Sequence, residues 1–236
     1  AKGGKHRRLA RRSSRAAPLL ELRDAIRALA QRGLRFLRTP RGLLRGLGGA
    51  LRLGFLAVSL APGGALGGVH RGFEASMDVS ADLFELAHTQ MIVVCSGPKV
   101  ILDLPRTREA LETMGVTLVG YRTDDMPAFW ARHSGLAVDM RADSPQDIAA
   151  VARARAELGI GGSILVCNPV TPDLAIDIDE IEGWIASCID DAPAGAAATP
   201  WLLAEIARRS GGRSLAANKQ LIIDNAALAG AIAACL

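Results

Sequence analysis

Residues 91–99 contain the pattern that decides the fold, and they read Met91-Ile92-Val93-Val94-Cys95-Ser96-Gly97-Pro98-Lys99. The first five form a continuous apolar run of strand length, which predicts a buried strand. The Ser-Gly-Pro that follows is typical of a turn. Lys99 therefore lies just past a strand end, where open α/β sheets commonly have a ligand crevice.

Helical and strand-like patterns alternate on the C-terminal side of this strand, and one helix precedes it. Helices are predicted over 78–88, 105–114, 144–158, 177–189, 200–209 and 215–235, and further strands over 116–121 and 163–167. Ser80 and Ser144 stand at expected N-cap positions, and Pro145 suits a first helical turn. The alternation predicts an α/β fold, in which a mainly parallel sheet has helices on both faces.

Charge divides the chain into two parts. Residues 1–62 hold 15 of the 28 Lys and Arg residues and only two acids, Glu21 and Asp24, whereas the rest is net negative by 9. Residues 38–62 alternate Gly, Leu and Arg with no period that fits a helix or strand. We therefore expect a basic, low-complexity segment over 1–62 and one ordered domain over 63–236.

The basic segment is open to several interpretations. Its run from Lys2 to Arg15 would suit a nucleic-acid-binding arm, a transit peptide or a solvated tail, and a weak helical period follows over 19–37. The acidic body offers no basic surface for nucleic acid. The chain also lacks a clean apolar run of about 18 residues. We expect a soluble, cytoplasmic protein that binds neither nucleic acid nor membrane.

The cysteines are widely spaced and form no CxxC pair. Such spacing is typical of buried, reduced thiols rather than of a metal site. The four are Cys95, Cys167, Cys188 and Cys235.

Lys99 is the first candidate for chemistry, and no other lysine occurs between Lys5 and Lys219. An amine beside an apolar strand end is poorly solvated when charged, which favours the neutral form that attacks a sugar carbonyl carbon. Position alone also allows an ordinary surface lysine.

An acidic cluster stands at the start of the first predicted helix. Asp78 and Asp82 would share a face if the helix began early, and could bind a divalent cation or accept hydrogen bonds from sugar hydroxyls. Ser80 and Asp82 could equally cap the helix. His70, after the small residues 67–69, gives a weak signal, and an amide such as Asn218 usually faces solvent or the helix backbone.

Motifs distributed from Gly67 onward resemble the pseudouridine-5′-phosphate glycosidase family, which includes indigoidine synthase A-like proteins. The matching stretches occur in collinear order at 67–72, 78–83, 94–99, 101–105, 123–129, 168–169, 199–200, 211–215 and 217–218. A collinear series of this length is poorly explained by chance.

The resemblance implies a lyase-type enzyme that reversibly cleaves pseudouridine 5′-phosphate to uracil and ribose 5-phosphate through a lysine imine. It places Lys99 at the nucleophile and Asp78 at the manganese ligand, so Mn²⁺ is the implied cofactor. It implies substrate contacts from the segment Ser80, Ala81 and Asp82, and from His70 and Asn218. It also implies a homotrimer.

One part of the family pattern has no counterpart here. Upstream of Gly67 the family has a general-acid glutamate and a substrate-binding lysine, and the surroundings of Glu21 do not resemble that motif. We therefore expect a domain that is incomplete at its N-terminal end, with an altered reading frame or start as one origin of the basic segment. The alternatives are a non-catalytic remnant that at most binds sugar phosphate and, from the basic run, a nucleic-acid binder.

Overall fold

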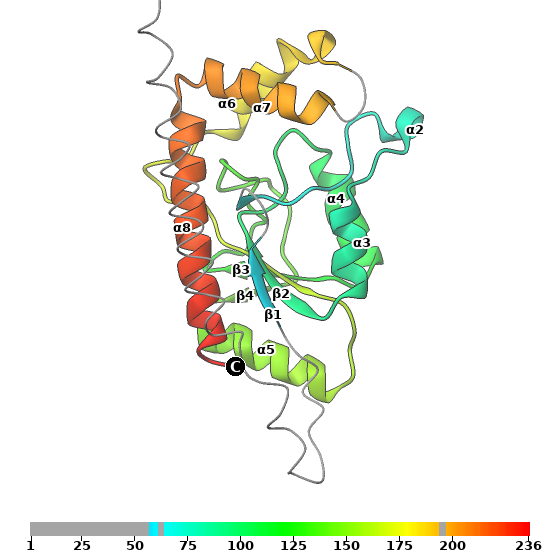
Figure 1. Ribbon diagram of the computed structural model, residues 1–236, viewed down its shortest axis with the longest axis vertical. Helices are drawn as coiled ribbons and strands as arrows, with labels where there is room; N and C mark the ends of the chain where they lie inside the picture. Colours follow the sequence, from blue (N-terminus) through cyan, green and yellow to red (C-terminus); the bar gives the residue numbers. More distant parts are fainter. Residues whose placement is uncertain (1–56, 61–63, 194–196) are drawn as a thin grey trace, which may run out of the picture. The chain divides into compact units, whose positions relative to one another are not determined.

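The computed structural model describes residues 57–60, 64–193 and 197–236, and its centre is a five-stranded sheet (Figure 1). Every neighbouring pair of strands is parallel, which confirms the predicted parallel sheet. The strands lie in the order β1 (Ala57–Leu60), β2 (Met91–Cys95), β5 (Ile164–Cys167), β3 (Thr117–Tyr121) and β4 (Met140–Ala142).

Helices cover both faces of the sheet. Successive side chains of β2 point to opposite sides, so they show which helices pack on each face. Val93 and Cys95 pack in the apolar cluster that includes α3 (Ala81–His88) and α4 (Leu104–Thr113). Ile92 and Val94 pack in a second cluster with α5 (Pro145–Glu157) and the C-terminal half of α8 (Arg213–Ala233). Figure 1 shows α8 running along one side of the sheet, with α3 and α4 on the other. The predicted three-layer α/β architecture is confirmed.

Two more helices, α6 (Ile178–Ala186) and α7 (Ala198–Arg209), pack against each other. Figure 1 shows them together beyond one end of the sheet. Their buried side chains extend the first apolar cluster, and they are Ile181, Ile185, Leu202 and Ile206. The short helix α2 (Phe73–Ser76) and the 3₁₀ turn η3 (Ile189–Asp191) complete the described elements.

The helix starts follow the capping residues seen in the sequence. The Ser80 side chain accepts a hydrogen bond from Asp82 N, and Ser144 forms a reciprocal capping box with Asp147. Pro145 opens α5, as predicted. The six predicted helices and three predicted strands are all present, with ends that differ by up to three residues.

The sheet also contains two strands that the sequence pattern did not predict. β1 pairs with β2 from Ala57 opposite Met91 to Leu60 opposite Val94, so the sheet extends into residues 38–62, for which no element was expected. β4 has only three residues and pairs with β3. Strands of three or four residues are too short to show an alternating apolar pattern, and they form by hydrogen bonding to a neighbouring strand. The basic run 2–15 and the weak helical period 19–37 lie outside the described residues.

Within the residues described, none of the helices combines the length and the apolar character needed to cross a membrane.

Candidate active site

The turn that carries Lys99 is joined to the Gly-rich segment that precedes the first helices. Leu66 N donates to Gly97 O at 3.0 Å, and Lys99 N donates to Leu66 O at 3.0 Å. Gly97 has φ +81, and a Cβ there would lie 1.7 Å from Pro127 O, so only glycine fits this close approach. Lys99 itself is partly buried. The backbone around the predicted nucleophile is therefore held from two sides.

The same Gly-rich segment also pairs, through Gly68 and His70, with the acidic cluster at residues 78–80. His70 N donates to Asp78 O at 3.0 Å, and Ser80 N donates to Gly68 O at 2.9 Å. Residues 66–70 thus lie between the Lys99 turn and residues 78–80. The structure brings together three of the motifs that are separate in the sequence.

Asp78 and His70 face each other, with Asp78 Oδ2 and His70 Nδ1 3.8 Å apart. Their side chains are 43% and 28% exposed, so both remain open to solvent or a ligand. Asp78 stands before α3, which begins at Ala81. An early helix start was the condition for Asp78 and Asp82 to share one helical face, and it is not met, because α3 begins three residues after Asp78.

Asp82 and Ser80 have structural partners of their own. The Asp82 carboxylate accepts from Gly67 N at 2.8 Å, and Ser80 Oγ accepts from Asp82 N at 3.3 Å. A Cβ on Gly67 would lie 2.2 Å from Ser80 Oγ, so the two segments touch directly. Ala81, the first residue of α3, is exposed. Helix capping is thus confirmed for Ser80, and it leaves open a further role in binding substrate.

Asn218 lies on α8, and its buried Oδ1 atom has no hydrogen-bond partner among the residues that the structure describes. A Cβ at Gly64 would be 3.5 Å from that oxygen, so the amide lies beside residue 64 rather than facing bulk solvent. A buried carbonyl oxygen without a donor is uncommon, and it is suited to accept a hydrogen bond from a ligand.

A second amide on the same helix, Asn225, was not identified from the sequence. It is 1% exposed, about two turns beyond Asn218 and therefore on the same face of α8. Its Nδ2 donates to Ser96 Oγ at 3.1 Å and to Gly64 O at 3.4 Å, and its Oδ1 accepts from Asn168 at 3.0 Å. Asn225 ties α8 to the ends of β2 and β5. In the sequence, the one feature that could have identified Asn225 is its spacing of about two helical turns from Asn218.

Two cysteines occupy the adjacent strand ends. Cys95 and Cys167 are direct partners in the pairing of β2 with β5, and both are fully buried. The hydrogen bond with Cys95, and then burial, raise the pKa of the Cys167 thiol well above its usual range. Cys167 therefore stays protonated at neutral pH and is unsuited to act as a nucleophile.

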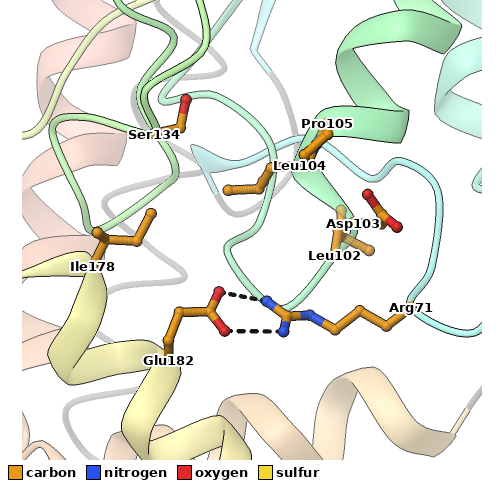
Figure 2. A pocket seen from close by; sticks show the side chains of 8 residues that line it. All are labelled: Arg71, Leu102, Asp103, Leu104, Pro105, Ser134, Ile178 and Glu182. Atoms are coloured by element: carbon orange, nitrogen blue, oxygen red, sulfur yellow. Dashed lines mark hydrogen bonds and ion pairs between the residues drawn. The ribbon is translucent and has the colours of Figure 1, made fainter.

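A surface cavity of about 310 Å³ lies where Lys99's turn runs into α4 (Figure 2). It is lined by Arg71, residues 102–105, Ser134, Ile178 and Glu182. None of the predicted site residues lines it. Figure 2 shows Arg71 paired with Glu182 at its edge.

The described residues contain no group of three or more His, Cys, Asp and Glu side chains that could hold a metal ion. Asp78 and His70 supply one carboxylate and one imidazole at the same place. These are donors that a divalent ion such as Mn²⁺ accepts, with water filling its other positions. The donor set is therefore compatible with a manganese ion held mainly by water.

The comparison with known families decides the assignment, since residues 55–235 match the family model described as indigoidine synthase A like protein. The chain belongs to this family. The match begins before β1, so it includes the strand that the sequence pattern missed. The resemblance predicted from the motifs is confirmed.

Among the curated relatives of the chain, a pseudouridine-5′-phosphate glycosidase of Methylobacterium nodulans is 52% identical over 73% of the chain. One of Hahella chejuensis is 47% identical over 72%. The chain spans 52% and 58% of the lengths of these relatives.

Two solved structures share the fold. An indigoidine synthase A-like protein from Thermotoga maritima has a TM-score of 0.68 and 37% identity, and covers 74% of this chain and 57% of its own. The prealnumycin C-glycosynthase AlnA, in complex with ribulose 5-phosphate, has a TM-score of 0.69 and 36% identity over 75% of this chain and 59% of its own.

Proposed function

We propose that this chain carries the imine-forming part of a pseudouridine-5′-phosphate glycosidase. The supporting observation is the arrangement around Lys99. This residue follows the buried strand β2, and its backbone is hydrogen-bonded to residues 66–70, the segment that includes His70 and pairs with Asp78. The names of the relatives support the same activity, and AlnA offers a related protein with a bound sugar phosphate.

The reaction breaks a carbon–carbon bond between the sugar C1′ and uracil C5, which has no leaving nitrogen to protonate. In the proposed course the ring opens as the C1′–O4′ bond breaks and O4′ takes a proton, and the Lys99 nitrogen bonds to C1′ and gives up a proton. The C1′–C5 bond then breaks, its electrons go to the uracil ring, and C5 takes a proton. The nitrogen lone pair forms the imine. Water hydrolyses that imine, which releases ribose 5-phosphate and the free amine.

The other predicted residues would bind and orient the sugar phosphate. Ser80, Ala81 and Asp82 lie at the start of α3, where Ala81 is exposed and the other two are half-buried. Asn218 has a buried oxygen with no donor among the described residues, and it would accept from a sugar hydroxyl. Asp78 would hold Mn²⁺ beside His70, and the ion would order water and sugar hydroxyls when bound.

The general acid has no assigned residue, since no glutamate motif was matched and Glu21 lies outside the described residues. That mismatch favours the second candidate, a protein that binds sugar phosphate without turnover. Release of uracil from pseudouridine 5′-phosphate distinguishes the two. A homotrimer and a cytoplasmic location stay predictions.

Covalent trapping tests the nucleophile directly. Borohydride reduction in the presence of ribose 5-phosphate should leave one sugar adduct on Lys99, located by peptide mass spectrometry. The adduct should disappear in Lys99→Ala and persist in Lys219→Ala, which removes an exposed lysine from α8. A folded wild-type protein that traps no sugar, or an adduct that survives in Lys99→Ala, would refute the assignment.

A further inference from the structure

We propose that Arg71 is a positioning residue, which holds the turn carrying Lys99 through two backbone carbonyls and is itself oriented by Glu182. The inference rests on the proposed role of Lys99. Neither residue was given a role by the sequence pattern, although Arg71 lies inside the motif at 67–72.

The turn after Lys99 buries polar backbone. Leu102 N donates to Lys99 O at 3.0 Å, which closes the turn. Val100 and Ile101, in its middle, are 0% and 4% exposed. Buried carbonyl groups need donors, because an unpaired one keeps the full cost of its lost hydration.

Arg71 supplies those donors from outside the turn. Its Nη2 donates to Val100 O at 3.0 Å, and its Nε donates to Ile101 O at 3.1 Å. Two successive carbonyls thus meet one rigid guanidinium, which fixes the direction of the turn as well as its place.

Glu182 on α6 completes the arrangement from a position 111 residues away in sequence. Arg71 Nη1 donates to Glu182 Oε2 at 2.9 Å and Nη2 donates to Oε1 at 2.5 Å, a bidentate pair seen in Figure 2. The two side chains are 37% and 38% exposed. The carboxylate leaves the guanidinium few other orientations, so it presents the same edge to the turn.

Backbone contacts hold the rest of the turn, and they show what Arg71 adds. Lys99 N is bound to Leu66 O, and Asp103 N is bound to Val69 O at 3.0 Å. These contacts fix the two ends of the turn, whereas Arg71 contacts its middle. Loss of the guanidinium should therefore loosen the turn without unfolding the domain. A shift of about 1 Å in a reacting group can cost roughly 100-fold in rate.

The test compares Arg71→Lys and Glu182→Gln with a matched control on the same helix. Glu180, also on α6, forms an ion pair with Arg213 at the start of α8; the Arg213 and Glu180 side chains are 51% and 40% exposed, and the pair is separate from the Arg71 contacts to the Lys99 turn. Glu180→Gln therefore removes a similar charge pair from the same element. All variants are made in the full chain, and their melting temperatures are compared first.

Hydrogen exchange gives a readout that does not depend on activity. The amides of Leu102 and Asp103 should exchange at least about tenfold faster in Arg71→Lys and Glu182→Gln than in wild type, because local opening limits their protection. Glu180→Gln should leave them unchanged. Equal protection in all four proteins would overturn the proposal.

Borohydride trapping with ribose 5-phosphate gives the second readout. Arg71→Lys should lower the trapping rate at saturating sugar at least about tenfold and change the half-saturating concentration less than about twofold, as expected for lost positioning rather than lost binding. Unchanged trapping in Arg71→Lys, with wild type trapping normally, would overturn the positioning role alone. Wild type that traps nothing would instead refute the proposed function, while the exchange data would still decide whether Arg71 holds the turn.

Discussion

Single polar residues in this protein hold the strand ends in place. Asn225 is buried on α8 and bonds at once to Ser96 just after β2, to Asn168 just after β5 and to Gly64. Its amide has both a donor and an acceptor, so it donates to Ser96 and accepts from Asn168. The Oδ1 atom of Asn218, on the same helix face, has no hydrogen-bond partner within the described part of the chain. The two amides therefore differ, since Asn225 bonds to several segments and Asn218 keeps an acceptor that no described residue uses.

At this scale we predict that Asn225→Ala lowers the free energy of unfolding by about 1–3 kcal/mol, because Ser96 and Asn168 lose a buried partner. Urea denaturation followed by circular dichroism measures the change. Asp224→Ala is the control, since Asp224 is the neighbouring residue and accepts from Gln220, on its own helix. An equal loss in both variants would show that the buried network adds nothing specific.

The helices begin where their capping side chains stand. In α5 the Ser144 side chain accepts from Asp147 N, and the Asp147 carboxylate accepts from the Ser144 backbone. These contacts, with the Ser144 side chain first, lower the pKa of Asp147 below its usual value. The cap therefore favours the ionised carboxylate, and its contribution is present at neutral pH and lost as the pH falls below the ordinary range of a carboxyl.

For this element we predict that Ser144→Ala costs about 1 kcal/mol of unfolding free energy at pH 7. Ser144→Gly should cost less, because glycine is tolerated at an N-cap. The difference between wild type and Ser144→Ala should shrink when the same urea titration is repeated at acid pH, where Asp147 is protonated. A difference that grows toward acid pH would contradict the assigned sign.

At the scale of the molecule, the sheet depends on strands that lie at its two edges. Among the strands that the structure describes, β1 pairs with β2 alone, and β2 leads into Lys99. An unpaired edge exposes backbone groups to water and to other chains. Loss of β1 would make β2 the edge, next to the candidate site.

We therefore predict that a chain beginning at residue 63 melts at a lower temperature than one beginning at residue 57, and aggregates more readily. Differential scanning calorimetry and light scattering at matched concentration measure both effects. Less ribose 5-phosphate should also be trapped on Lys99 by borohydride in the shorter chain. Identical melting and trapping would mean that β1 contributes neither to the sheet nor to the turn that follows β2.

Local patterns in the sequence were sufficient for the α/β class, for β2 and for most helix starts. An apolar run, a capping serine or a proline in a first turn depends on neighbouring residues, so it can be read without knowing the fold. The motifs likewise placed the chain in its family, and they placed Lys99, Asp78 and His70 in one candidate site.

Tertiary structure alone decided which distant residues meet. The short strands β1 and β4 exist because a neighbouring strand offers hydrogen bonds, and their own sequences carry no period. Arg71 reaches Glu182, and Asn225 reaches Ser96, over more than a hundred residues of chain. Such contacts depend on how helices pack against the sheet, and no local pattern encodes that packing. The fold class could therefore be predicted from the sequence, whereas the support beneath the Lys99 turn required the structure.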